Sequence, residues 1–134
     1  MNKLTLIKAG SIAFVVLGIA HLSVTAMGAP ESEQLTRLLA DMQNYKINLF
    51  GEHDLLKFHN GFGLMMGVLL SSFGAQNLVL SEAIVVNRKA QWTTMVITAI
   101  VLVISIVYFH LLADGFILFS LACYSLALFS RSHK

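Results

Sequence analysis

Histidine is the residue type in this chain that is best suited to chemistry, and four of the five histidines border long apolar segments. His21 lies inside the first apolar segment, His53 precedes the second, His59 opens the second and His110 closes the third. Neutral imidazole binds zinc, copper and iron, and it gains or loses a proton near neutral pH. These histidines therefore suggest a metal site, a haem site or an acid–base pocket, provided that the fold brings them together.

Two carboxylates and one amide accompany the histidines. Glu52 precedes the second apolar segment, Asn60 lies at its start, and Asp114 follows the third. A carboxylate can orient a metal-bound imidazole from the second coordination shell, or it can change the affinity of that ring for a proton. Because no HxxxH, ExxH or CxxC spacing occurs, the pattern selects no single metal, and haem, copper and zinc all stay open as cofactors.

The same polar residues also have a structural interpretation. Near a membrane surface, the polar tips of His59 and His110 would reach water and headgroups. Asp114 would cap the last helix, and His21 would form a hydrogen bond across a helix bundle. The placement of four histidines on one side of the expected spans favours a shared site, but the sequence leaves both interpretations open.

Four apolar segments must position these residues. Of the 134 residues, 57% are hydrophobic and 12% are charged, and that charged share is about half the one in soluble domains. A chain this short cannot bury so much apolar surface in water, whereas a bilayer-spanning helix needs only about 20 such residues. We therefore predict an all-α integral membrane four-helix bundle. The single membrane domain, 1–134, has spans at about 8–29, 57–81, 92–112 and 114–130.

The connections between the spans differ greatly in length. The first, 30–56, contains leucines and a methionine at helical spacing (Leu35, Leu38, Leu39, Met42). This pattern predicts a short amphipathic helix that lies on the membrane surface or caps the bundle, with an irregular linker broken at Gly51 after it. A single helix over residues 92–130 would be about 58 Å long, nearly twice the hydrocarbon thickness. We therefore predict a tight turn at residues 113–115.

Charge placement predicts the orientation. The two ends of the chain and the second connection carry six basic residues and one acidic residue, whereas the other two connections carry three basic and six acidic residues. Basic loops stay in the cytoplasm, so we expect a multi-pass protein of the inner (plasma) membrane with both termini cytoplasmic and connection 30–56 extracytoplasmic. The alternative is a signal peptide over residues 1–29, whose cleavage would leave three spans.

Other features concern packing and partners. Small residues recur every four positions in the second span, at Gly63, Gly67, Ser71 and Ala75, and such stripes let another helix approach closely. They predict that the second span lies at the centre of the bundle. The single cysteine excludes an intramolecular disulfide, and the net charge of +2 gives no reason to expect nucleic acid.

A family resemblance adds to this prediction. Residues 18–22 (Gly-Ile-Ala-His-Leu) and 59–64 (His-Asn-Gly-Phe-Gly-Leu) resemble segments of small bacterial four-span proteins of the DoxX type. The resemblance implies four membrane helices and an accessory or redox-linked role, since some DoxX-like proteins are associated with quinone-linked oxidoreductase systems. It transfers no catalytic residue.

Together these observations predict an outward-facing histidine and carboxylate pocket that binds a metal, haem or a small lipophilic molecule. The resemblance implies that this pocket is redox-linked. The alternative is a non-catalytic accessory or assembly subunit, which would bind a membrane protein partner or a second copy of itself. The sequence leaves open whether the protein is an enzyme.

Overall fold

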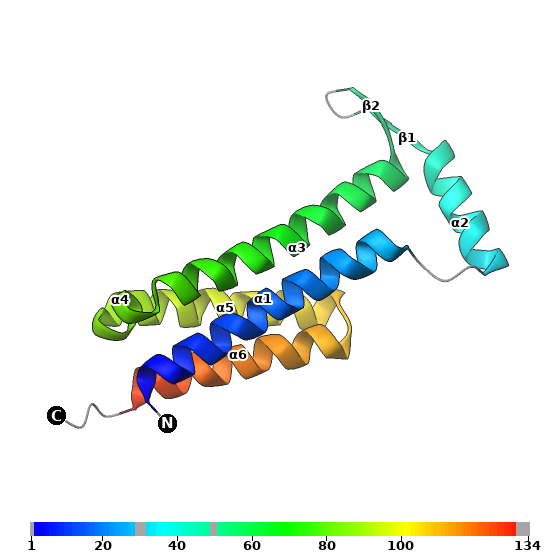
Figure 1. The fold of residues 1–134 in the computed structure, drawn as a ribbon. Coiled ribbons are helices and arrows are strands. Elements are labelled where there is room, and N and C mark those ends of the chain that lie inside the picture. The colour runs from blue at the N-terminus through cyan, green and yellow to red at the C-terminus, as the bar shows by residue number, and fades with distance from the viewer. Residues whose placement is uncertain (1, 29–31, 49–50, 131–134) are drawn as a thin grey trace.

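The computed structural model describes residues 2–28, 32–48 and 51–130. Four long helices form the body of the molecule: α1 (Lys3–Met27), α3 (Leu55–Val79), α5 (Arg88–Tyr108) and α6 (Leu111–Phe129) (Figure 1). Each is long and apolar enough to cross a membrane. The prediction of an all-α membrane bundle with four spans is confirmed. Pro30 and Glu31, in the connection after the first span, and His133, the fifth histidine, lie outside the described residues.

The helices are arranged around α1. This helix packs against α3 on one side and α6 on the other, and α5 packs against α6. No comparable contact joins α3 to α5. The start of α1 and the end of α6 lie together, which we call the terminal end, and the short segments between α1 and α3 lie at the opposite end, which we call the hairpin end (Figure 1).

Glycines explain the close approach of α1 and α3. A Cβ atom on Gly74 would lie 2.6 Å from the carbonyl oxygen of Ser11, and one on Gly67 would lie 2.6 Å from the Leu22 side chain. Without side chains at these points, the two backbones come close enough for extensive van der Waals contact, which drives helix association in lipid.

The predicted stripe is therefore used, but only in part. Gly67 and Ser71 face α1, Gly63 faces it more loosely, and Ala75 is exposed while the neighbouring Gly74 makes the close contact. The central helix is α1 rather than α3. The reason is that α1 carries small residues on two faces, with Gly18 against α3 and Gly10 against α6.

Hydrogen bonds also join α1 to α6 at the terminal end. The Ser120 hydroxyl donates to the carbonyl oxygen of Gly10 at 2.9 Å, and the Ser11 and Tyr124 hydroxyls lie 3.2 Å apart. All of these residues are buried. Since no water is present to compensate polar groups in the hydrocarbon region, such bonds hold the two helices in one register.

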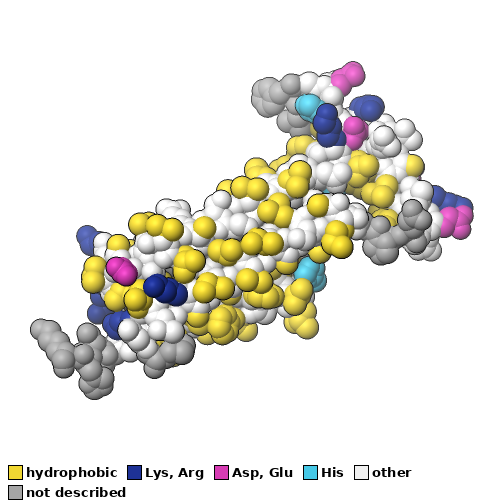
Figure 2. Space-filling view, viewed as in Figure 1, with side chains coloured by type: hydrophobic (Ala, Val, Ile, Leu, Met, Phe, Trp, Pro, Cys, Tyr) yellow, Lys and Arg dark blue, Asp and Glu magenta, His cyan; other side chains and the backbone are white. Residues whose placement is uncertain are grey.

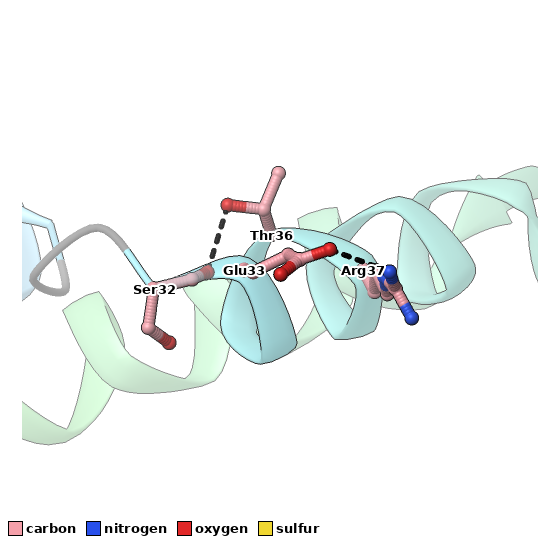
Figure 3. Close-up of polar contacts among 4 residues, drawn as sticks. All are labelled: Ser32, Glu33, Thr36 and Arg37. Atoms are coloured by element: carbon pink, nitrogen blue, oxygen red, sulfur yellow. Dashed lines mark hydrogen bonds and ion pairs between the residues drawn. The ribbon is translucent and has the colours of Figure 1, made fainter.

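The predicted amphipathic helix is present as α2 (Glu33–Asn44). Ser32 caps its start, where Thr36 also donates a hydrogen bond to the Ser32 carbonyl oxygen, and Glu33 pairs with Arg37 at 2.6 Å (Figure 3). Its half-buried apolar residues are Leu35, Leu39 and Met42, and the helix packs against α3. This contact attaches α2 to the hairpin end of the bundle.

The sequence predicts an irregular linker after α2, and this prediction is wrong. The linker forms two short antiparallel strands, β1 (Lys46–Asn48) and β2 (Glu52–Asp54), with Ile47 opposite His53. Gly51 adopts a φ of 139° between them, a conformation that side chains other than glycine rarely tolerate. A further short helix, α4 (Ser81–Val86), joins α3 to α5 at the terminal end (Figure 1).

The turn between α5 and α6 lies earlier than predicted. It consists of Phe109 and His110 rather than residues 113–115, and Asp114 belongs to the first turn of α6. The Ser105 hydroxyl donates to the Asp114 carboxylate at 2.6 Å across the two helices. This bond requires the chain to reverse before Asp114, and it satisfies two polar side chains that a longer α5 would leave apart.

Hydrophobic side chains cover the bundle along its whole length, whereas charged side chains gather at its two ends (Figure 2). Many large apolar residues on all four long helices are exposed. This pattern is the one expected of a surface that contacts lipid. The chain is a multi-pass membrane protein.

Candidate functional site

A cleft opens between α3 and α5. It has a volume of about 410 Å³, and its walls come from these two helices while α1 and the first half of α6 form its floor. It exists because α3 and α5 each pack on a neighbour but not closely on one another. Of its 18 lining residues, 15 are apolar. The three polar residues that line it are His21, Ser105 and His110.

His21 lies on α1 in the half of the bundle nearer the hairpin end. Its ring is half-buried, and its Nε2 atom is buried without a hydrogen-bond partner among the described residues. A Cβ atom added to Gly63 on α3 would lie 3.9 Å from Nε2. One edge of the ring therefore packs against α3 while the residue also borders the cleft.

His110 reaches the same cleft from the turn between α5 and α6. It occupies the N-cap position of α6, but its side chain makes no capping hydrogen bond and is exposed. The side chain is therefore free to interact with a molecule in the cleft. The early turn matters here, because it moves His110 out of α5 and into a connection beside α1.

Asp114 has a different partner from the one expected. Its carboxylate accepts a hydrogen bond from Ser105 at 2.6 Å, and this distance is typical of a charge-assisted O–H···O⁻ bond. It joins α5 to α6 rather than capping α6 from the N-cap position. Through Ser105, which lines the cleft, the carboxylate lies behind the polar end of the cleft.

The other candidate residues do not join this site. Glu52, His53, His59 and Asn60 are exposed, and none of them lines the cleft. The segments described contain no group of three or more His, Cys, Asp or Glu residues that could hold a metal ion. Of the four histidines that the sequence placed on one side, the structure brings two, His21 and His110, to one cavity.

Sequence reasoning missed Ser105 and the apolar walls. Ser105 carried a usable signal, since a hydroxyl within the apolar segment Val101–Tyr108 must find a hydrogen-bond partner inside a membrane. The cleft walls carried no such signal, because the same apolar residue types face a cleft and face lipid.

Comparisons with known proteins gave no match: no family model, curated protein or solved structure is significantly similar to this chain. The DoxX-type resemblance therefore stays a prediction. Any functional conclusion must come from the geometry of the cleft.

Proposed function

We propose that this protein binds a small lipophilic molecule with a polar head in the cleft between α3 and α5. The observation that carries the proposal is a cavity of about 410 Å³ with 15 apolar lining residues and two histidines. Small-molecule sites typically have volumes of roughly 300–1,000 Å³, mostly apolar walls and a few polar groups that fix the orientation of the ligand.

Access from the bilayer supports this class of ligand. Wall residues on both sides of the cleft, such as Leu69 on α3 and Ile97 and Ile104 on α5, are exposed. In a membrane these side chains face lipid, so a molecule already dissolved in the bilayer reaches the cleft without crossing water.

Hydrogen bonds must supply the selectivity. The apolar walls bind a hydrocarbon tail little better than lipid does, because lipid is equally apolar. A hydrogen bond from His21 or His110 gains strength in this medium of low dielectric constant. The histidines would therefore distinguish the ligand from membrane lipid.

A resident zinc or copper ion has less support, since the described residues offer two histidines at the cleft and no third ligand of a usual type. Haem held by two histidines is a separate outcome, and it would be visible as an absorption band in the purified protein.

We infer the orientation from charge. At the terminal end, Lys3, Lys8, Arg88 and Lys89 oppose Glu82, so the positive-inside rule puts this end in the cytoplasm of a cell with a plasma (inner) membrane. The cleft histidines then lie toward the outer leaflet. Topology reporters fused after Asn44 and after Ser130 test this orientation. We expect them to report opposite sides of the membrane, and a report from the same side would contradict the inferred orientation.

The experiment for the proposed function uses protein purified in nanodiscs, followed by organic extraction, mass spectrometry and an absorption spectrum. We expect a discrete lipophile from the wild-type protein and its loss from His21→Phe and His110→Phe. His59→Phe is the matched control, because His59 is exposed and does not line the cleft. An extract that contains only bulk membrane lipid would contradict the proposal.

The small-residue face of α3 does not support the accessory-subunit alternative. The Gly67 and Ser71 face of α3 already packs against α1, so it offers no free surface to a partner. A partner that co-purifies in fixed ratio with a protein lacking any discrete lipophile would favour the alternative, through the remaining lipid-facing surfaces.

A further inference from the structure

The buried edge of His21 indicates which chemical group the ligand carries. We infer that the head of the ligand is a carbonyl, which accepts a hydrogen bond from the Nδ1–H group of His21. This inference rests on the proposed function, since it specifies the chemistry of the molecule in the same cleft.

The first step concerns the tautomer of His21. A neutral imidazole carries one proton, on either Nδ1 or Nε2. The Nε2 atom of His21 is buried against α3 with no hydrogen-bond partner among the described residues. Buried N–H groups without a partner are rarer than buried acceptors without one. The proton therefore belongs on Nδ1, and Nε2 keeps its lone pair against Gly63.

The second step concerns the direction of the donor. Nδ1 makes no hydrogen bond to the described residues, and it is not among their buried polar atoms that lack a partner. His21 lines the cleft, so this accessible N–H group is its available donor there. A neutral imidazole held in this tautomer can donate to a ligand but cannot accept from one through Nδ1.

The third step concerns Ser105, one of the two other polar residues that line the cleft. The proton of the Ser105 hydroxyl is already donated to Asp114, so Ser105 has no free donor for a ligand. A head that needs only to accept, such as a ketone or an ester, therefore matches His21 without competing for Ser105. A hydroxyl head can also accept from His21, but its own proton must then find an acceptor at Ser105 Oγ or at His110, a requirement that a carbonyl does not have.

The tautomer can be measured without any ligand. In protein labelled with ¹⁵N-histidine, long-range ¹H–¹⁵N spectra distinguish a protonated nitrogen from one with a lone pair. We expect the signals of His21, assigned by their loss in His21→Phe and their retention in His59→Phe, to show the proton on Nδ1. A proton on Nε2, as in free histidine in water, would overturn the inference.

The ligand class is tested with three matched probes in nanodiscs: an octyl phenyl ketone, the corresponding alcohol and the corresponding hydrocarbon. We expect the ketone to bind about tenfold more tightly than the hydrocarbon, as one hydrogen bond would give, and more tightly than the alcohol. His21→Phe should abolish the preference, and His59→Phe should retain it.

The two proposals fail in different ways. If all three probes bind equally and Ile97→Trp in the cleft wall displaces them, the carbonyl inference is wrong and the cleft still binds lipophiles. If none of them binds above the level in empty nanodiscs, while the spectra confirm the tautomer, the proposed function itself is contradicted for this class of molecule.

Discussion

The two halves of the bundle are built differently. All buried residues of α1 lie between Leu6 and Gly18, and none lies in the last nine residues of the helix, nearest the hairpin end. In the terminal half, α1 makes hydrogen bonds to α6 through Ser11 and Ser120, and it approaches α3 at Gly74. Toward the hairpin end, the cleft separates α3 from α5, and His21 is only half-buried.

The difference separates stability from binding. Helices in lipid are held together mainly by close packing and interhelical hydrogen bonds. The hydrogen bonds between α1 and α6 lie in the terminal half, and the close packing of α1 against α3 runs from Gly74 to Gly67 without involving α5. The cleft between α3 and α5 can therefore stay open, because these contacts set the register and spacing of α1, α3 and α6 without α5. A rigid scaffold beside an open site is what precise placement of His21 and His110 requires.

The largest effect should come from filling the tight interface. Gly74→Val would place side-chain atoms where the Ser11 carbonyl oxygen and the Val15 amide nitrogen lie within 2.7 Å of a new Cβ. Because backbone atoms cannot move aside easily, we expect a loss of about 3 kcal/mol in unfolding free energy, measured by denaturant titration in detergent.

Gly61→Val is the control for this substitution, since a Cβ there meets nothing within 4 Å, and we expect no measurable loss. Equal tolerance of both variants would mean that α1 and α3 are not packed at Gly74, and the contrast between the two halves would disappear.

The second-largest effect concerns ligand binding in the cleft. Ile97→Trp should fill the cleft and weaken lipophile binding at least tenfold, measured by ligand titration in nanodiscs, while the unfolding free energy changes by less than about 0.5 kcal/mol. Ile100→Trp, on the same helix but not lining the cleft, should leave binding unchanged. Equal loss in both variants would show a general effect of tryptophan on the helix.

The smallest effect concerns the link across the α5–α6 turn. Ser105→Ala removes the donor to Asp114, and we expect a loss of about 1 kcal/mol in unfolding free energy. A double-mutant cycle with Asp114→Asn should give a coupling energy of similar size. Thr93→Val, which loses only a hydrogen bond within its own helix, is the control. Zero coupling would favour the later turn that the sequence predicted.

Composition and periodicity predicted the architecture because lipid constrains it so strongly. Any chain with four apolar segments of this length must form spanning helices, and the amphipathic spacing of Leu35, Leu39 and Met42 was equally informative about α2. The exact turn between α5 and α6 could not be predicted, because it depends on the pairing of Ser105 with Asp114 across two helices.

The site was less predictable than the fold for a related reason. Helix rotation decides whether a histidine faces a neighbouring helix, a cavity or lipid, and no residue pattern in the chain determines that rotation. The sequence grouped both His59 and His110 with His21, but His59 is exposed outside the cleft and only His110 lines it together with His21. The early turn, which the sequence missed, is what moves His110 there.

Photo-crosslinking in cells tests the cleft most directly. A photoreactive benzoylphenylalanine replaces Leu69, which lines the cleft, or Ile100, which faces lipid outside it. We predict a covalent adduct of one discrete small mass at position 69 and only phospholipid adducts at position 100. The same phospholipid adducts at both positions would contradict the account, because the cleft would then be ordinary lipid-exposed surface.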